Sequence, residues 1–455
     1  MARSGALRGE IQMTEGSLWK NILLFSIPLV FSQLLQVMFN MADVAVVGKF
    51  ASDTALGSVG STSTLVTLFT GFLIGMGNGV NVRVAQHLGA RHEAETSRSI
   101  HTAFLLCTIA GLVIMGLCLA LAADMLEVLH TKEDLLPGAV LYFRIYALGM
   151  PGLGIFNFGN AVLSANGDTK RPLLYLTIAG VLNVILNLFF VIVCKMAADG
   201  VALASVISQY VSAILVVWHM MRLTDACRFR FSALRLHCDE VGRILGLGVP
   251  AGIQNMIFAI ANLFIQAAVN SFDSTMVSGN AAAANTDTII YNIMMAFYTA
   301  CSTFMGQNWG AGHKRRMMES YLISLCYSFG IAAVLGVAFY FAGRPFLYVF
   351  TNSPEVVEAG MQRMKIMCLS YAISAFMDTT IAACRGLGRT IVPTVVVILG
   401  SCVFRVIWVY TIFAHYQTIP SLYLLYAFSW TITATAEIVY FLHCFRRLRL
   451  APEAA

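Results

Sequence analysis

The chain has 455 residues, of which 58% are apolar and only 11% are charged, and its mean hydropathy is +0.76. Soluble globular proteins carry about 25% charged residues. Apolar runs of about twenty residues recur along this chain, so the sequence predicts a polytopic membrane protein and excludes a soluble one.

The N-terminal stretch up to Lys20 is polar and mixed in charge. It has no short apolar region followed by a small-residue cleavage site, so we expect no removable signal peptide. Twelve apolar segments follow, each long enough to cross a bilayer as a helix and too long for a strand of a membrane barrel. The predicted helices lie near residues 22–47, 56–80, 99–122, 136–156, 173–194, 201–221, 245–269, 279–304, 318–342, 359–384, 392–413 and 419–444.

Lysine and arginine are unevenly distributed among the predicted loops. Most of the 29 basic residues fall in the two termini and in the loops after even-numbered helices, whereas the opposite loops contain only Lys49, Lys132, Lys195 and Arg344. Because basic loops stay on the cytoplasmic side, we expect a multi-pass protein of the cell membrane with both termini in the cytoplasm. This bias accounts for the net charge of +6 and gives no reason to expect nucleic-acid binding.

The second half of the chain repeats landmarks of the first half in the same order. Pro28 has its counterpart in Pro250, Asn40 in Asn262, and AQHLGARH (residues 85–92) in GQNWGAGH (residues 306–313). An even number of helices per half makes the two copies parallel, related by an axis along the membrane normal. The sequence therefore predicts an all-α integral membrane fold with twelve transmembrane helices in two pseudo-symmetric six-helix lobes.

The predicted lobes are joined by a short basic connector. This connector either lies on the membrane surface as a partly amphipathic segment or forms a plain loop. Two-lobed bundles place a substrate site between the lobes and alternate its access, whereas a channel more often uses a ring of subunits, so the duplication favours a transporter. The expected boundaries are a cytoplasmic tail at 1–17, an N-terminal lobe at 18–221, the cytoplasmic connector at 222–243, a C-terminal lobe at 244–444 and a cytoplasmic tail at 445–455.

Asp43 lies inside the first predicted helix, where a carboxylate costs about 2.5–3.5 kcal/mol on insertion scales. Gln33, Gln36 and Asn40 precede it at helical spacing, so the four side chains share one face. A polar face on an apolar membrane helix must contact the bundle interior or water. We therefore expect Asp43 to have polar partners on neighbouring helices.

The fifth and sixth helices provide such partners in Asn183, Asn187 and Ser205, with Ser208 nearby. Carboxylate, amide and hydroxyl oxygens are hard ligands that suit a small alkali cation, and the same pocket suits a proton. We expect a carboxylate oxygen of Asp43 within about 6 Å of an Asn183 or Asn187 side chain. The alternative is interhelical hydrogen bonding of about 0.6–2 kcal/mol per contact. The predicted cation-coupling residues are Asp43, Asn183, Asn187 and Ser205. The only metal ion we expect to bind is Na⁺, at Asp43, Asn183 and Asn187.

Further polar side chains on the predicted helices are candidate contacts for a substrate. The helix near 245–269 has a polar face but no acid, and the next helix carries Asp287 with two tyrosines on one face. Asp378 is expected to pair with Arg405 in a structural ion pair. The candidate cavity residues are Gln36, Asn40, Asn255, Asn262, Asp287, Tyr291 and Tyr298.

The sequence has no pattern typical of an enzyme site or a bound cofactor. The 11 cysteines are dispersed, with no CxxC and no zinc-like spacing to histidine. No HExxH, GxSxG or Walker motif is present, so we expect neither catalytic residues nor direct use of ATP. Gly71, Gly75 and Gly79 recur at intervals of four and predict close helix packing.

Several stretches together resemble the MATE family, the multidrug and toxic compound extrusion transporters. They are IPLVFSQLLQVMFNMADVAVVG, VAQHLGARH, LSANGDTKRP, GVLNVILN, VALASVISQ, GQNWGAGH and CRGLGRT. The constellation around Asp43 is similar to the cation site of the DinF-like branch, where these groups bind a proton or sodium. Members of the family often carry Asp at the position of Asn187 and Thr at that of Ser205, so the resemblance leaves the choice of ion open. The helix 7 acid of the NorM-like branch is absent here.

The residues and the resemblance together predict a secondary active transporter, not an enzyme. It would be an H⁺- or Na⁺-coupled antiporter that exports organic, often cationic or amphipathic, compounds by alternating access, working as a monomer in lipid without a cofactor. The alternative is a lipid-linked saccharide flippase of the same wider superfamily. Such a flippase would need a basic cavity, and the intramembrane bases are few: Arg144, Arg363, Lys365 and Arg405.

Overall fold

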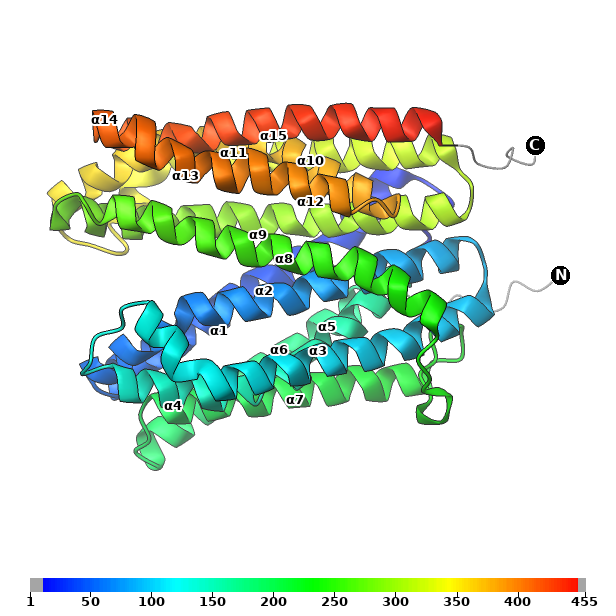
Figure 1. The fold of residues 1–455 in the computed structure, drawn as a ribbon, viewed down its shortest axis with the longest axis horizontal. Helices are drawn as coiled ribbons and strands as arrows, with labels where there is room; N and C mark the ends of the chain where they lie inside the picture. The colour runs from blue at the N-terminus through cyan, green and yellow to red at the C-terminus, as the bar shows by residue number, and fades with distance from the viewer. Residues whose placement is uncertain (1–10, 449–455) are drawn as a thin grey trace. The chain divides into compact units, whose positions relative to one another are not determined.

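The computed structural model describes residues 11–448, and within that range the ordered elements are all helical, as predicted (Figure 1). Outside the described range lie most of the predicted N-terminal tail and the end of the predicted C-terminal tail. In the first half the α-helices are α1 (Leu18–Phe50), α2 (Asp53–Gly89), α3 (Glu93–Val128), α4 (Leu136–Ala147), α5 (Met150–Ala165), α6 (Lys170–Leu188) and α7 (Ala198–Arg222). In the second half they are α8 (Cys238–Val269), α9 (Ser274–Gly310), α10 (Lys314–Leu347), α11 (Pro354–Gly386), α12 (Ile391–Val397), α13 (Phe404–Trp408), α14 (Ala414–Tyr416) and α15 (Ile419–Arg447).

Eleven helical spans in the described range are long and apolar enough to cross a membrane, and the bent pair α4 and α5 makes a twelfth if it counts as one. The predicted helix at 136–156 is thus broken, with a bend of 44° between α4 and α5. Pro151 explains the break, since its ring removes a backbone donor and disfavours helical geometry in the residue before it. Two other spans include π-helical turns: one has Phe189–Val193, and the other has Ile398–Val403 and Val409–Phe413.

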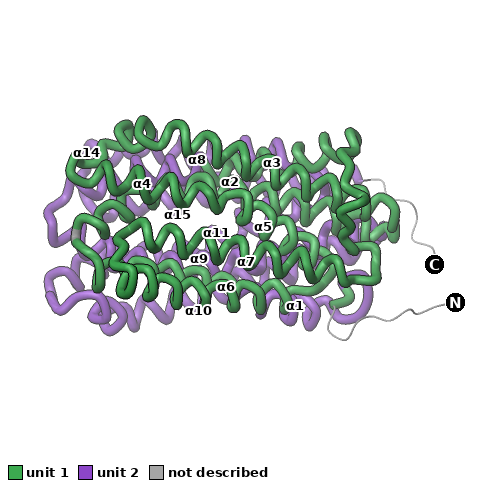
Figure 2. The backbone as a smooth tube through the Cα atoms, turned by 90° about the horizontal axis from the view of Figure 1, so that it is seen from below, with its two compact units in different colours: residues 1–12, 31–256 green, residues 13–30, 257–455 purple. Residues whose placement is uncertain are grey.

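The chain forms two compact units, which Figure 2 shows in different colours. Unit 1 contains the described residues up to Gln12 and Phe31–Met256, and unit 2 contains Met13–Val30 and the described residues from Ile257 onward. The first part of α1 therefore belongs to unit 2, and the first part of α8 belongs to unit 1. These two exchanged segments distinguish the compact units from the predicted lobes, whose boundaries follow chain order.

The glycines of α2 allow the start of α8 to approach closely within unit 1. A Cβ added at Gly75 would overlap the backbone of Gly252, and one added at Gly79 would overlap the backbone of Gly248. Asn255 supports the same contact, because its Nδ2 donates a hydrogen bond of 2.8 Å to the Gly71 carbonyl oxygen. The close packing predicted from the glycine spacing is confirmed, with α8 as the partner helix.

Replacing Gly75 with alanine is expected to destabilise the protein, because backbone atoms cannot move aside as a flexible side chain can. Overpacking of this kind costs roughly 1–3 kcal/mol. Gly60→Ala in the same helix is the matched control, since no atom lies within 4 Å of a Cβ at Gly60. Thermal unfolding in detergent should show a lower melting temperature for Gly75→Ala and an unchanged or higher one for Gly60→Ala. Equal melting temperatures would contradict the packing argument.

The connector between α7 and α8 is shorter than the predicted 222–243, because α8 already begins at Cys238. Its only regular element is a single 3₁₀ turn, Phe231–Ala233. Phe229 is buried against Phe104 and His101, and the Arg230 backbone N–H donates to His101 Nε2 at 3.0 Å. The connector is thus a loop that packs against α3, and its position on the membrane surface stays a prediction.

Candidate functional site

Asp43 lies in the second part of α1, within unit 1, and its carboxylate is held by side chains from two other helices. Asn187 near the end of α6 donates from Nδ2 to Asp43 Oδ1 at 2.5 Å. Ser205 in α7 donates from Oγ to Asp43 Oδ2 at 3.4 Å. Each carboxylate oxygen therefore has its own donor, and three helices meet at this group.

The two asparagines of α6 are linked to one another and to α7. Asn187 Nδ2 also contacts Asn183 Oδ1 at 3.2 Å, and Asn183 Nδ2 donates to Ser205 Oγ at 3.4 Å. The approach of Asp43 to this pair, predicted from the sequence, is confirmed, and Asn187 is the direct neighbour. Asn183, Asn187 and Ser205 are all buried, so they form a buried polar cluster within otherwise apolar helices.

One oxygen of the cluster is left unused. Asn187 Oδ1 is buried and accepts no hydrogen bond from the described residues. A buried acceptor without a partner costs about 1–3 kcal/mol, so the site gains from a cation or a proton that satisfies it. Rotating the Asn187 amide by 180° would exchange donor and acceptor, which allows the same residue to bond an ionised or a protonated Asp43.

The remaining candidate residues of unit 1 differ in their surroundings. Asn40, one turn before Asp43 on α1, and Gln36, two turns before it, are exposed. Asn255 is partly buried, and its amide is engaged by the Gly71 carbonyl of α2. This bond gives Asn255 a structural role that the sequence did not reveal, while Gln36 and Asn40 keep free polar surface for a ligand.

In unit 2, Asp287 on α9 forms an ion pair with Arg363 on α11, and each side chain is largely buried. Arg363 also donates to the hydroxyl of Tyr423 at 3.2 Å and stacks its guanidinium over that ring. Asp287 is therefore balanced by a fixed positive charge. A second cation at this carboxylate would have to compete with the guanidinium.

The predicted ion pair between Asp378 and Arg405 is wrong, because the described residues include no such pair. Arg405 Nε donates to Ser429 Oγ at 3.1 Å, and the guanidinium lies 4.3 Å from the ring centroid of Tyr426. Aromatic rings and a hydroxyl of α15 thus take the place of the expected carboxylate. Cation–π contacts of this kind offset part of the cost of burying a charge.

The two candidate tyrosines of α9 lie in different environments. Tyr298 is buried and accepts a hydrogen bond from Arg385 on α11, whereas Tyr291 is 46% exposed. Asn262 on α8 is also exposed. As contacts for a substrate, these residues and Asp287 remain predictions.

A buried charged cluster at the start of α8 in unit 1 was not predicted from the sequence. Glu240 accepts two hydrogen bonds from Arg83 on α2, at 2.9 and 2.6 Å, and one from Ser99 on α3 at 2.5 Å. His87 Nε2 lies 3.3 Å from the same carboxylate. Because these residues are far apart in sequence, only the approach of α8 to α2 brings them together.

Known proteins provide an independent comparison for this fold. The chain is 29% identical to the probable multidrug resistance protein YpnP of Bacillus subtilis (strain 168), covering 79% of this chain and 80% of that one. It is 24% identical to a FAD transporter of Shewanella oneidensis, over 70% and 72% of the two chains. A solved MOP superfamily transporter from Pyrococcus furiosus Vc1 superposes with a TM-score of 0.90 at 19% identity, over 97% and 99% of the chains, and supports the fold.

The model of the MatE family matches the chain twice, over residues 28–189 and 250–411. The second match begins and ends 222 residues after the first, which confirms the duplication inferred from the paired landmarks. The first match includes Asp43, Asn183 and Asn187, whereas Ser205 on α7 lies between the two matched ranges. The chain therefore belongs to the MatE family, and the resemblance to multidrug and toxic compound extrusion transporters is confirmed.

Proposed function

We propose that this transporter is a secondary active antiporter in which H⁺ or Na⁺ at Asp43 exchanges for an organic compound. The observation that carries the proposal is the contact of Asp43 with Asn187 and Ser205 beside the unused Asn187 Oδ1. A carboxylate, two amide groups and a hydroxyl supply oxygen ligands for one small cation. The charge of that cation would balance the buried carboxylate.

Cation entry would change the hydrogen bonds that connect α1 to α6 and α7. A proton on Asp43 turns one carboxylate oxygen into a donor, which favours the rotated amide of Asn187. A sodium ion would instead draw the carboxylate, amide and hydroxyl oxygens of the site toward itself. Either change alters the packing of α1 and biases the equilibrium between outward-open and inward-open states.

Unit 2 provides a contrast that favours Asp43 as the coupling residue. Asp287 already has a guanidinium partner in Arg363. Asp43 has no cationic partner within 4 Å among the described residues, so its charge is available to an exchangeable ion. This difference supports unit 1 as the location of the proposed ion site.

The relatives support export of organic compounds as the activity, since one is named as a probable multidrug resistance protein and another as a FAD transporter. We propose the cell membrane as the location, with both termini cytoplasmic, because basic residues concentrate on that side. The protein would act as a monomer of two pseudo-symmetric lobes, with Gln36, Asn40, Asn262, Asp287, Tyr291 and Tyr298 as candidate contacts for the exported compound.

Ethidium efflux from exporter-deficient bacteria tests this function directly. Cells expressing the wild-type chain should lose dye faster than cells with an empty vector. Dissipating the proton gradient and the sodium gradient separately should stop efflux in one case, which identifies the ion. Efflux that continues without either gradient would contradict secondary active transport. If ethidium is not moved, uptake assays with flavin nucleotides and other organic anions would extend the test to other substrates.

A further inference from the structure

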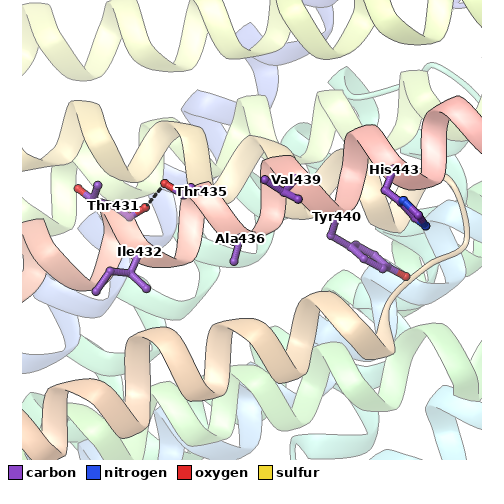
Figure 3. Close-up of a pocket in the computed structure, with 7 residues that line it drawn as sticks. All are labelled: Thr431, Ile432, Thr435, Ala436, Val439, Tyr440 and His443. Carbon is purple, nitrogen blue, oxygen red and sulfur yellow. Dashed lines mark hydrogen bonds between the residues drawn. The ribbon is translucent and has the colours of Figure 1, made fainter.

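A shallow groove runs along α15 in unit 2, and Figure 3 shows the side chains that line it. The groove has a volume of about 710 Å³. Its lining residues follow helical spacing along one face of α15. They are Thr431, Ile432, Thr435, Ala436, Val439, Tyr440 and His443.

The groove is apolar although it includes two threonines. Thr431 Oγ1 donates to the Ala427 carbonyl at 2.7 Å, and Thr435 Oγ1 donates to the Thr431 carbonyl at 2.8 Å. Both hydroxyls are therefore satisfied by their own helix, as the dashed line in Figure 3 shows for Thr435. The exposed side chains of Ile432 and Val439 complete a surface that suits a hydrocarbon chain.

One end of the groove is basic. A second hollow shares Val439 and His443 with the first and is lined further by Leu442, Arg446 and Arg447. Both arginines are exposed and make no ion pair with the described residues. They lie in the last turn of α15, on the side of the membrane predicted to be cytoplasmic.

The length of the groove matches one leaflet of a bilayer. From Thr431 to His443 the helix rises about 18 Å, close to the roughly 15 Å of hydrocarbon in one leaflet. Tyr440 lies near the basic end, where tyrosine is enriched at the boundary between hydrocarbon and headgroups. The apolar part of the groove therefore lies at the depth of an acyl chain, and its basic end lies at the depth of a phospholipid headgroup.

We propose that this groove binds an anionic phospholipid of the surrounding bilayer. One acyl chain would lie along Thr431–Tyr440, and the headgroup phosphate would contact His443, Arg446 and Arg447. Basic pockets at the cytoplasmic ends of transmembrane helices bind anionic headgroups in this way. The inference depends on the membrane orientation and does not require ion coupling at Asp43.

Native mass spectrometry of the delipidated protein in a neutral detergent tests the proposal, with phosphatidylglycerol and phosphatidylcholine of equal chain length as probes. The wild-type chain should bind phosphatidylglycerol more tightly. Arg446→Gln/Arg447→Gln should weaken that binding roughly thirtyfold, since each basic residue near an anionic headgroup contributes about fivefold. Ala436→Phe should also weaken it by filling the groove at an exposed position.

The matched control is Lys20→Gln/Arg315→Gln, which removes two exposed charges from unit 2 on the same predicted side. It should bind phosphatidylglycerol as the wild type does. Equal binding of the two lipids by the wild type, or equal losses in the control and in the arginine variant, would overturn the proposal. The proposal would also be overturned if the wild type formed a dimer without lipid and Ala436→Phe dissociated it. The groove would then be an interface between two copies of the chain.

Discussion

Asp43→Asn is expected to reduce gradient-driven efflux strongly while leaving the folded protein in the membrane. Asparagine has nearly the same shape and can still accept a hydrogen bond from Asn187, but it cannot be protonated or balance the charge of sodium. Coupling free energies between two ligands are typically 1–3 kcal/mol, so removing the coupling should lower efflux roughly 5- to 150-fold. Initial rates of ethidium efflux, at matched protein levels, measure the effect.

Asp124→Asn is the control for this experiment. Asp124 is an exposed acid of α3 in the same unit, and its replacement should leave efflux unchanged. If Asp43→Asn exports dye at the wild-type rate and still responds to the gradient, Asp43 is a structural residue, and the ion site must lie elsewhere. A variant that is absent from the membrane would point to misfolding, and size-exclusion chromatography distinguishes that outcome from lost coupling.

Glu240→Gln is expected to cause the largest loss of stability. Arg83 and Glu240 form a bidentate pair whose side chains are only 7% and 8% exposed. Removing one partner of a buried ion pair leaves the other charge uncompensated and costs about 3–5 kcal/mol. Thermal unfolding in detergent should show a melting temperature several degrees below that of the wild type, because Arg83 is left as a buried charge without its carboxylate partner.

Two further variants separate the charge effect from general damage. Glu319→Gln removes an acid from the exposed pair with Arg315, which contributes at most about 1 kcal/mol, so its melting temperature should barely change. Arg83→Met/Glu240→Gln should be more stable than Glu240→Gln alone, because no unpaired charge remains. A double variant less stable than the single one would show that Arg83 acts through contacts other than Glu240.

The environment of Asp43 could be predicted from sequence because helical spacing determines which side chains share a face. Asn183 and Asn187 are one turn apart, and an acid inside an apolar helix requires partners of their kind. Helical spacing does not predict the position of the bend before Pro151. An apolar segment with proline is compatible with one kinked helix or with two helices.

Pairings between distant helices were not predictable. The order of the helices along the chain predicts a pair of Arg405 with Asp378, yet the Arg405 guanidinium contacts aromatic rings and Ser429 of α15. Asp287 pairs with Arg363, and Glu240 with Arg83, across long sequence separations. Hydropathy and spacing describe one helix at a time, whereas these contacts depend on rotation and depth of both helices.

The second half of the chain repeats the helices but has no acid at the position of Asp43, and under the proposed coupling at Asp43 this sets the charge moved in each cycle. At the offset of 222 residues, Asp43 corresponds to Ile265, which is buried in unit 2. With one exchangeable monovalent cation per cycle, export of a monovalent organic cation is electroneutral and draws only on the ion concentration gradient. Export of a neutral compound moves one net charge and gains about 2.3 kcal/mol per 100 mV, equivalent to roughly fiftyfold accumulation. The voltage dependence of export should therefore differ between cationic and neutral compounds.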